Sequence, residues 1–467
     1  MKKTLTLAVG IVSSLSVKAQ HNLGVATGNW SSINSLYLNP ANIAESREKK
    51  SVSVIGGMFF VDNNVGPFNA GNGLVVAIGD GKTNDMFAYR NNSKISMMAP
   101  YFNIMGPGAV YRVDNKSSIA VTSRLRGMNQ FNFFDQTIFH AFNDPTYTPD
   151  ENILSLPRDF AYTVHLWLEI GFTYAKTVYE KENHKIKLGG SFRYLGGIAY
   201  VGVKGNTMNA AFTKGVDSFY ASNSDIQYGS NILNTFTYQG NNFSKNLINL
   251  VREGNFGHGI GGDVGIVYEF TASDPDEGND KKKRRKKKPG YTTRLSASIC
   301  DIGGIAYGKR VNTNQVINGE GYVTAKGILD NVKNFANMEK YVEARGFTAT
   351  TRKRNTFVNM PTHIKLGADY HIKDKYYING MMLVNLASRR TWGNSFYNQV
   401  SVTPRYETKK LTIGLPITYG ILSRSMKLGT GFYYRNFYIG SDDMLAFFSK
   451  SQYGINLYAG MTKRFYK

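Results

Sequence analysis

The sequence has little of what stabilises small secreted domains or helical membrane proteins. Cys300 is the only cysteine in 467 residues, so no disulfide can form within the chain and a disulfide-stapled scaffold is excluded. Prolines number only 12, and beyond the first twenty residues no apolar run reaches the ~18 residues of a membrane-spanning helix. Acidic residues are also scarce, 33 against 56 basic ones, which gives a formal net charge of +23. An exported soluble protein or a membrane β-barrel remains.

The first nineteen residues have the features of a signal peptide. Lys2 and Lys3 precede an apolar stretch over residues 5–17, and a cleavage site of the A-x-A type ends at Ala19. The stretch is too short to span a bilayer as a helix. We therefore expect residues 1–19 to be removed and the mature chain to be exported, which leaves no role for a nucleic-acid partner.

Alternating hydrophobicity predicts strands with one apolar and one polar face. The composition, with 48 glycines, 30 tyrosines and 28 phenylalanines, favours strands over helices. Residues 163–174, 185–194, 362–372 and 452–465 each place apolar side chains at every second position, with polar or charged side chains between them. One face of such a strand suits hydrocarbon and the other suits water.

Strand length and aromatic placement favour a membrane barrel over a soluble β-sandwich. Several alternating runs reach the ~9–11 residues of a tilted transmembrane strand, and aromatic residues such as Tyr174, Tyr194 and Phe465 lie near strand ends. We predict a 14-stranded antiparallel transmembrane β-barrel. The fourteen strands are expected at 51–62, 98–113, 117–129, 160–178, 185–203, 257–270, 291–308, 361–372, 376–388, 396–406, 410–419, 425–434, 437–442 and 451–465.

The connections alternate between short turns and long segments. In outer-membrane barrels short turns face the periplasm and long loops face outwards. The long segments 63–97, 130–159, 204–256 and 309–360 are therefore expected outside. Within 309–360, residues 326–346 have apolar side chains at helical spacing, and they would either cap the barrel mouth or contact a partner.

The charged hairpin at 271–290 follows the sixth predicted strand, where the alternation of connections gives a short turn. We therefore expect it in the periplasm. It carries a run of eight basic residues, Lys281, Lys282, Lys283, Arg284, Arg285, Lys286, Lys287 and Lys288, preceded by an acidic patch. Two interpretations stay open for this run. It is either a solvated turn with no partner or a docking arm for an acidic periplasmic surface.

Residues 20–50 precede the barrel proper, which spans 51–467. Within them residues 29–46 predict two short helical turns broken at Asn39-Pro40, too brief to be stable without a wall to pack against. The motif Asn39-Pro40-Ala41 resembles the N-terminal segment of FadL-like outer-membrane barrels of Bacteroidota, and residues 296–309 and 426–445 look like strand signatures of a family of unassigned function from the same bacteria. The resemblance implies a plug or hatch at 20–50, an integral place in the Gram-negative outer membrane, and contact with its lipid and lipopolysaccharide.

No catalytic, cofactor-binding or metal site is predicted. Residues 257–262 match a dinucleotide-binding glycine pattern literally, but they open a strand instead of a helix. Basic side chains are expected to face the lumen at Lys185, Lys187, Arg193, Arg294 and Lys365.

Three functions fit these predictions, none of them enzymatic. The first is an accessory or scaffold subunit of an outer-membrane assembly or secretion complex, with outer-membrane or periplasmic protein partners. The second is a FadL-like transporter of a hydrophobic molecule, and the third is a channel for an anionic solute. We place the scaffold narrowly first, because unpaired charges in a plugged lumen would oppose transport.

Overall fold

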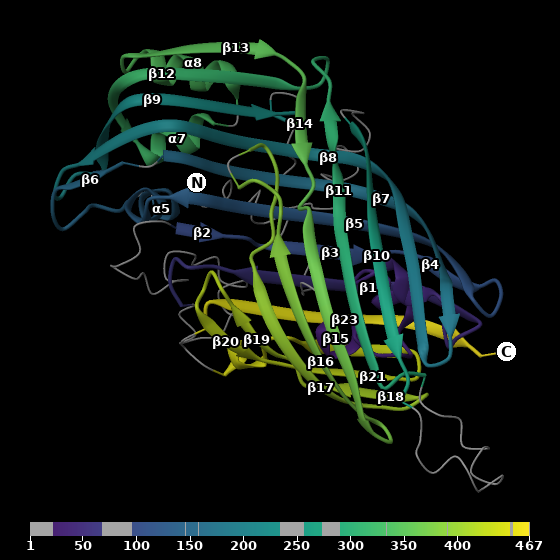
Figure 1. Ribbon diagram of the computed structural model, residues 1–467. Coiled ribbons are helices and arrows are strands. Elements are labelled where there is room, and N and C mark those ends of the chain that lie inside the picture. The colour runs from purple at the N-terminus through teal and green to yellow at the C-terminus, as the bar shows by residue number, and fades with distance from the viewer. Residues whose placement is uncertain are drawn as a thin grey trace, which may run out of the picture.

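The chain forms a closed antiparallel β-barrel (Figure 1). The computed structural model describes residues 22–67, 96–144, 146–156, 158–233, 256–272, 290–332, 334–389, 391–448 and 452–466. The signal peptide, the basic run at 281–288 and most of the charged hairpin lie outside the described residues. Closure is made by the first and last strands, which pair from Lys50 with Phe465 to Asp62 with Gly454.

Fourteen strands make the barrel, as the alternation predicted. In chain order they are β1 (Lys50–Asp62), β3 and β4 together (Tyr101–Met105, Gly108–Arg112), β5 (Ser117–Phe134), β7 (Arg158–Lys181), β8 (His184–Phe212), β10 (Gly257–Phe270), β11 (Thr293–Tyr307), β14 and β15 together (Thr356–Asn359, His363–Lys373), β16 (Tyr376–Asn385), β17 (Gln399–Glu407), β18 and β19 together (Leu411–Gly414, Ile417–Gly420), β20 and β21 together (Ser425–Leu428, Thr430–Tyr434), β22 (Phe437–Ser441) and β23 (Gly454–Phe465).

Four of these strands are interrupted, where the sequence predicted single runs. Pro416 has no N–H to donate and separates β18 from β19, while Gly429 separates β20 from β21. The break between β14 and β15 falls at residues 360–362 and includes Pro361. The strand order is unaffected, because both fragments of each interrupted strand pair with the strand that precedes them in the barrel.

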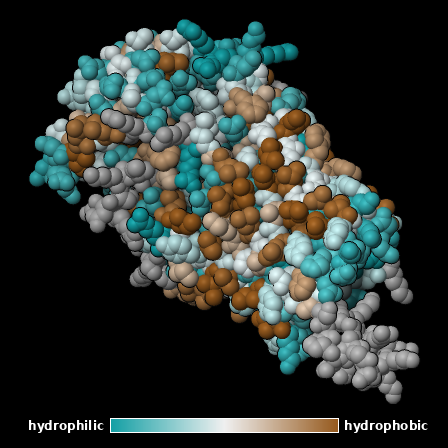
Figure 2. Space-filling model, in the orientation of Figure 1, coloured by the Kyte–Doolittle hydropathy of each residue, from teal (hydrophilic) through white to brown (hydrophobic). Residues whose placement is uncertain are grey.

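The outer surface of the barrel is apolar and its interior polar, the reverse of a soluble protein. On β7 the side chains of Leu168, Ile170 and Phe172 are exposed, whereas the intervening Glu169 and Thr173 are buried inside. Figure 2 shows the apolar side chains gathered over the middle of the molecule, with hydrophilic residues towards both ends. A barrel with such a band presents it to lipid, since all strand hydrogen bonds are satisfied by closure. Among the described residues, no helix is long and apolar enough to cross a membrane.

One end of the barrel carries a lobe where the sequence analysis expected loops at 204–256 and 309–360. Strand β8 runs for 29 residues, far beyond the ~9–11 that a membrane requires, and continues into this lobe. Three short elements that precede β1 are described below with the lumen. The other elements that are not barrel strands are β2 (Ser96–Met98), α5 (Gln136–Asn143), β6 (Ile153–Ser155), β9 (Ser218–Ser230), β12 (Thr313–Thr324), α7 (Ala325–Asn331), α8 (Phe335–Glu343), β13 (Phe347–Lys353) and η5 (Met444–Phe447). The segment 309–360 therefore contains more strand than helix, and its helices α7 and α8 lie between β12 and β13.

We call the end with this lobe the outer end. The opposite, inner end carries the short turns between paired strands, the start of β1 and the end of β23 (Figure 1).

Candidate functional site: a filled lumen with an ionic layer

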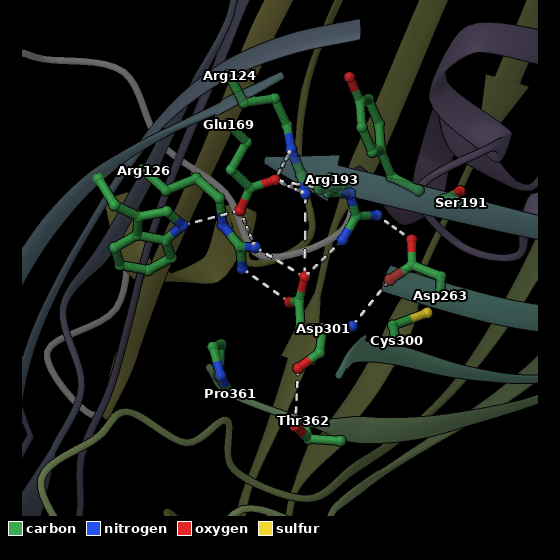
Figure 3. Close-up of polar contacts among 12 residues, drawn as sticks. Arg124, Arg126, Glu169, Ser191, Arg193, Asp263, Cys300, Asp301, Pro361 and Thr362 are labelled. Atoms are coloured by element: carbon green, nitrogen blue, oxygen red, sulfur yellow. Dashed lines mark hydrogen bonds and ion pairs between the residues drawn. The ribbon is translucent and has the colours of Figure 1, made fainter. Parts of the chain in front are cut away.

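A layer of charged side chains lies inside the lumen (Figure 3). Alternation along β5 turns Arg124 and Arg126 inwards together, and the neighbouring strands β7 and β8 contribute Glu169 and Arg193. Each of these side chains is less than 10% exposed. Alternation alone places them inside, but it does not say whether they meet.

Every member of this layer has a partner of opposite charge. The guanidinium of Arg126 donates to both oxygens of Asp301, at 2.8 and 2.9 Å, and also to Glu169 at 2.8 Å. Arg124 donates to Glu169 at 2.9 Å through Nε, and Arg193 pairs with Asp263 and, at 3.1 Å, with Asp301. Bidentate, charge-assisted contacts of this kind are the geometry in which buried charges are tolerated.

A β-bulge brings Asp301 into the lumen. The ladder between β10 and β11 shifts register between Gly262 and Val264, so that Cys300 and Asp301 together oppose Asp263. Asp301 has φ +56°, in the left-handed region. Without the bulge, alternation after the inward Cys300 would turn the carboxylate of Asp301 towards lipid.

A second ionic cluster lies nearer the inner end. Arg405 donates to both oxygens of Asp369, at 2.8 and 2.7 Å, and through Nε to Glu407 at 2.9 Å. Arg294 reaches Asp369 at 3.2 Å. Glu407 in turn accepts the backbone N–H of Asn29 at 2.9 Å, so this cluster also holds the chain that precedes the barrel.

Residues 22–48, which we call the interior segment, lie inside the barrel. They form α2 (Leu23–Ala26), α3 (Ser32–Ser35) and the 3-10 turn η1 (Pro40–Ile43). All three elements are mostly buried, although four residues are too few for a helix to be stable alone. Wall contacts therefore hold them.

The Asn39-Pro40-Ala41 motif makes the closest of these contacts. Asn39 caps η1 by accepting the N–H of Ala41 at 2.9 Å, and its amide donates to the carbonyls of Ile266 and Ala297 on two wall strands, at 3.1 and 3.0 Å. Opposite the motif the wall has glycine: a Cβ at Gly189 would lie 2.4 Å from the nitrogen of Ala41. The backbone of the interior segment therefore rests directly on the backbone of the wall.

Further polar contacts hold the rest of the interior segment. Lys365 donates to the carbonyl of Tyr37 at 2.6 Å, and Ser298 donates to that of Leu38 at 2.8 Å. Arg464 donates to the Trp30 carbonyl at 2.8 Å, and Asp442 accepts the N–H of Leu23 at 3.0 Å. A cavity between the ionic layer and the interior segment measures about 30 Å³, room for about two water molecules. At this level the interior segment and the ionic layer therefore lie close together across the lumen.

Towards the outer end the lumen becomes apolar. On β5 the inward residue after Arg126 is Met128, on β7 Trp167 precedes Glu169, and on β11 Tyr307 lies beyond Asp301. These side chains belong to one buried cluster, the apolar lumen cluster, which also extends past the ionic layer to Val25 on α2. Its methionines and aromatic residues include Met58, Met97, Tyr101, Met105, Met128, Trp167, Tyr200, Tyr307, Met360, Phe396 and Tyr397.

Residues 391–398 fold into this outer part of the lumen, and we call them the inserted loop. Ser395 exchanges hydrogen bonds with the inward-facing Gln130, at 2.7 to 2.9 Å, and Phe396 and Tyr397 are at most 3% exposed. Phe396 packs edge-on against Tyr101. The lumen is therefore filled from both sides.

The structure places the basic residues that we expected in the lumen as follows. Lys187 pairs with Glu269 at 2.8 Å, and Lys185 pairs with Glu180 and Glu45 at 2.8 and 3.1 Å. Arg193 and Arg294 belong to the two ionic clusters and Lys365 holds the interior segment. The residues expected in the lumen did not include Arg124, Arg126, Asp263, Asp301 and Arg405. Alternation within 117–129 was a signal for both arginines of β5, whereas none marked Asp301.

Comparisons with known proteins place the chain in a family without assigning a role. No curated protein matches the sequence. Similar solved structures include the toluene transporter TbuX of Ralstonia pickettii (TM-score 0.38, 11% identity, covering 92% of this chain and 93% of that one) and a FadL homologue of Pseudomonas aeruginosa (0.38, 10%, 96% and 96%). The toluene transporter TodX of Pseudomonas putida is also similar (0.39, 8%, 96% and 93%). A family model covers residues 40–442, so the chain belongs to the "Family of unknown function (DUF5723)".

Proposed function

We propose that the protein is a non-enzymatic outer-membrane channel for a small apolar molecule, closed in this structure by the interior segment and the inserted loop. The observation that carries the proposal is the apolar lumen cluster. A barrel that served only as a membrane anchor has no need of an apolar interior, because polar side chains fill a lumen as well.

The side chains of this cluster suit a variable occupant. Met97, Met105 and Met128 lie inside the barrel at no more than 6% exposure, beside aromatic rings. Methionine is unbranched and polarisable, so it adapts its shape to whatever it contacts. The inserted loop brings Phe396 and Tyr397 into the same space, where they act as an apolar occupant supplied by the chain itself.

The paired charges remove our main objection to transport. Unpaired basic groups in the lumen would make passage of an apolar molecule costly, whereas Arg126, Arg193 and Arg405 each contact carboxylates. Pairing also weakens the case for an anion channel, because the positive charge is compensated locally.

The features that favoured a scaffold role do not support it. The apolar stripe of 326–346 is buried within the lobe, where Phe335, Met338 and Val342 pack against strands of the same chain. The other feature, the basic run at 281–288, lies outside the described residues. Within the described residues, the scaffold hypothesis therefore has no structural observation behind it.

Two probes of different polarity test the proposal. Cells with and without the protein would be compared for uptake of the apolar dye N-phenyl-1-naphthylamine, and vesicles for swelling in the sugar arabinose. We expect the protein to accelerate dye uptake and to leave swelling unchanged. Swelling without any change in dye uptake would refute an apolar channel, as would no effect on either.

A further inference from the structure

The inner end of the barrel exposes more basic than acidic side chains. Ten exposed basic residues, which we call the basic collar, lie there: Lys50, Lys116, Lys176, Lys181, Lys373, Lys375, Lys409, Lys410, Arg435 and Lys463. The exposed acidic residues among the described residues at this end are Asp114, Glu180, Glu182 and Asp374. One of the four, Glu180, is already paired with Lys116 and Lys185. The collar therefore carries a net positive charge that the described part of the chain does not neutralise.

Aromatic rings hold several of these cations at the edge of the apolar band. The Lys409 ammonium lies 4.0 Å from the ring centroid of Tyr466, and that of Lys463 lies 5.4 Å from Phe465. The guanidinium of Arg435 lies 5.3 Å from the ring of Tyr434. Such contacts are cation–π interactions, and the rings involved are of the type that marks the interface between hydrocarbon and headgroups.

Two collar lysines sit on the lipid-facing side of their strands. Lys176 continues the exposed series of Phe172 and Tyr174 on β7, and Lys463 lies between the outward-facing Met461 and Phe465 on β23. A lysine in this position extends its ammonium from the edge of the hydrocarbon into the headgroup layer. In a bilayer these side chains would contact the lipid headgroups.

The collar also lies on several sides of the barrel. Its members lie on β1, β7 and β23 and at the inner turns that join β4 to β5, β7 to β8, β15 to β16, β17 to β18 and β21 to β22 (Figure 1). A protein partner would contact one side of a barrel, whereas the surrounding lipid contacts every side. The distribution therefore favours lipid over a protein.

We propose that the basic collar binds the phosphate groups of anionic phospholipids in the leaflet at the inner end of the barrel. Short turns mark that end as periplasmic. Clustered lysine and arginine side chains next to an apolar span attract anionic headgroups, each by about fivefold in affinity. This proposal does not depend on what the lumen carries.

Spin-labelled lipids test it on the full-length protein in phosphatidylcholine vesicles. The measured quantity is the association of labelled phosphatidylglycerol relative to labelled phosphatidylcholine at the protein surface. We expect a ratio above one at low salt that falls to one at about 1 M salt, where the Debye length is ~3 Å. The fourfold variant Lys373→Gln, Lys375→Gln, Lys409→Gln, Lys410→Gln should lower the ratio at low salt.

A matched control removes the same number of charges at the outer end. The variant Lys309→Gln, Arg310→Gln, Arg352→Gln, Lys353→Gln changes exposed residues away from the collar and should keep the wild-type ratio. Heat-modifiable migration on gels verifies that both variants fold. A wild-type ratio of one would overturn the proposal, and so would an equal loss in both variants. Salt-sensitive binding of polyglutamate with a lipid ratio of one would overturn it in favour of an acidic protein partner.

Discussion

Arg126 is the residue on which the ionic layer depends most. It is 1% exposed and contacts Asp301 and Glu169 at once. Arg126→Met leaves two buried carboxylates short of a partner, which typically costs 3–5 kcal/mol, so we expect the urea unfolding midpoint in phospholipid vesicles to fall accordingly. Lys326→Gln, which removes an exposed pair with Asp330, should change stability by less than about 0.5 kcal/mol. Equal stability of Arg126→Met and wild type would contradict this role.

Glu48 should make the docking of the interior segment depend on pH. It lies just before β1, accepts a hydrogen bond from Ser32 and has Arg464 at 3.9 Å. Burial raises the pKa of Glu48 from an ordinary 4.5 to about 7. A raised pKa means that docking favours the protonated form, so docking is strongest below about pH 4.5 and weakens as the pH rises through 7. Burial also raises the pKa of Asp442 to about 6, which acts in the same direction.

Acrylamide quenching of tryptophan emission checks this dependence, because Trp30 belongs to the interior segment. We expect quenching to increase between pH 5 and pH 8 in wild type. The increase should shrink in Glu48→Gln and disappear in Glu48→Gln with Asp442→Asn. Asp374→Asn, in an exposed turn, is the control and should behave as wild type. Quenching that falls with rising pH would contradict the assignment.

The same residues show where sequence reasoning stops. Alternation was enough to turn Lys187 and Arg193 inwards, because the ladder that joins their strand to β10 keeps one register throughout. Alternation did not predict that the side chain of Asp301 faces the lumen, because its orientation depends on a bulge. The partner of Arg193, Asp263, lies on another strand. The alternation within one strand does not determine which residues of the neighbouring strand lie opposite it.

At the scale of elements, the fit between η1 and the wall is open to test. A Cβ at Gly189 would meet the backbone of Ala41 at 2.4 Å, so Gly189→Ala should displace the interior segment. We expect trypsin to cleave after Arg47 in this variant and not in wild type. Gly190→Ala is the matched control, since its Cβ would have its nearest neighbour at 3.8 Å. Equal resistance of both variants would mean that the segment yields without leaving its place.

The lobe is expected to be stabilised separately from the barrel. Phe335 on α8 is 1% exposed and stacks on Tyr228. Phe335→Ala should cost the lobe about 3–5 kcal/mol through lost burial and a cavity. Hydrogen exchange should then accelerate in β12 and β13 while β5 and β7 stay protected. Lys340→Ala, an exposed position on the same helix, should leave exchange unchanged, and a uniform loss of protection in Phe335→Ala would show a single cooperative unit.

The strand predictions succeeded where a single strand spans the membrane and failed outside it. Strands β1, β10 and β16 begin within one residue of their predicted starts, because lipid on one side imposes a clean period of two. Strands β9 and β12 lie in the lobe, where both faces meet protein or water and the period is blurred. This is why the sequence predicted loops in these two segments.

At the scale of the whole molecule, one chain builds both a membrane wall and the material that fills it. The wall is fixed by backbone pairing, whereas the interior segment is held by side-chain contacts such as those of Lys365 and Ser298. For the proposed channel, this difference would allow the filling to move while the wall stays closed. The fold could be predicted from the sequence, but the filled lumen depends on contacts between distant residues.

A reversible lock on the interior segment tests this account most directly. The sulfur of Cys300 lies 3.8 Å from the carbonyl oxygen of Leu38, so Leu38→Cys introduces a second thiol on a residue that touches the native one. Uptake of N-phenyl-1-naphthylamine would be measured in this variant before and after oxidation, with oxidised wild type as control. The account predicts that oxidation reduces uptake to the level of cells without the protein and that reduction restores it. Uptake that continues unchanged with the disulfide formed would contradict it.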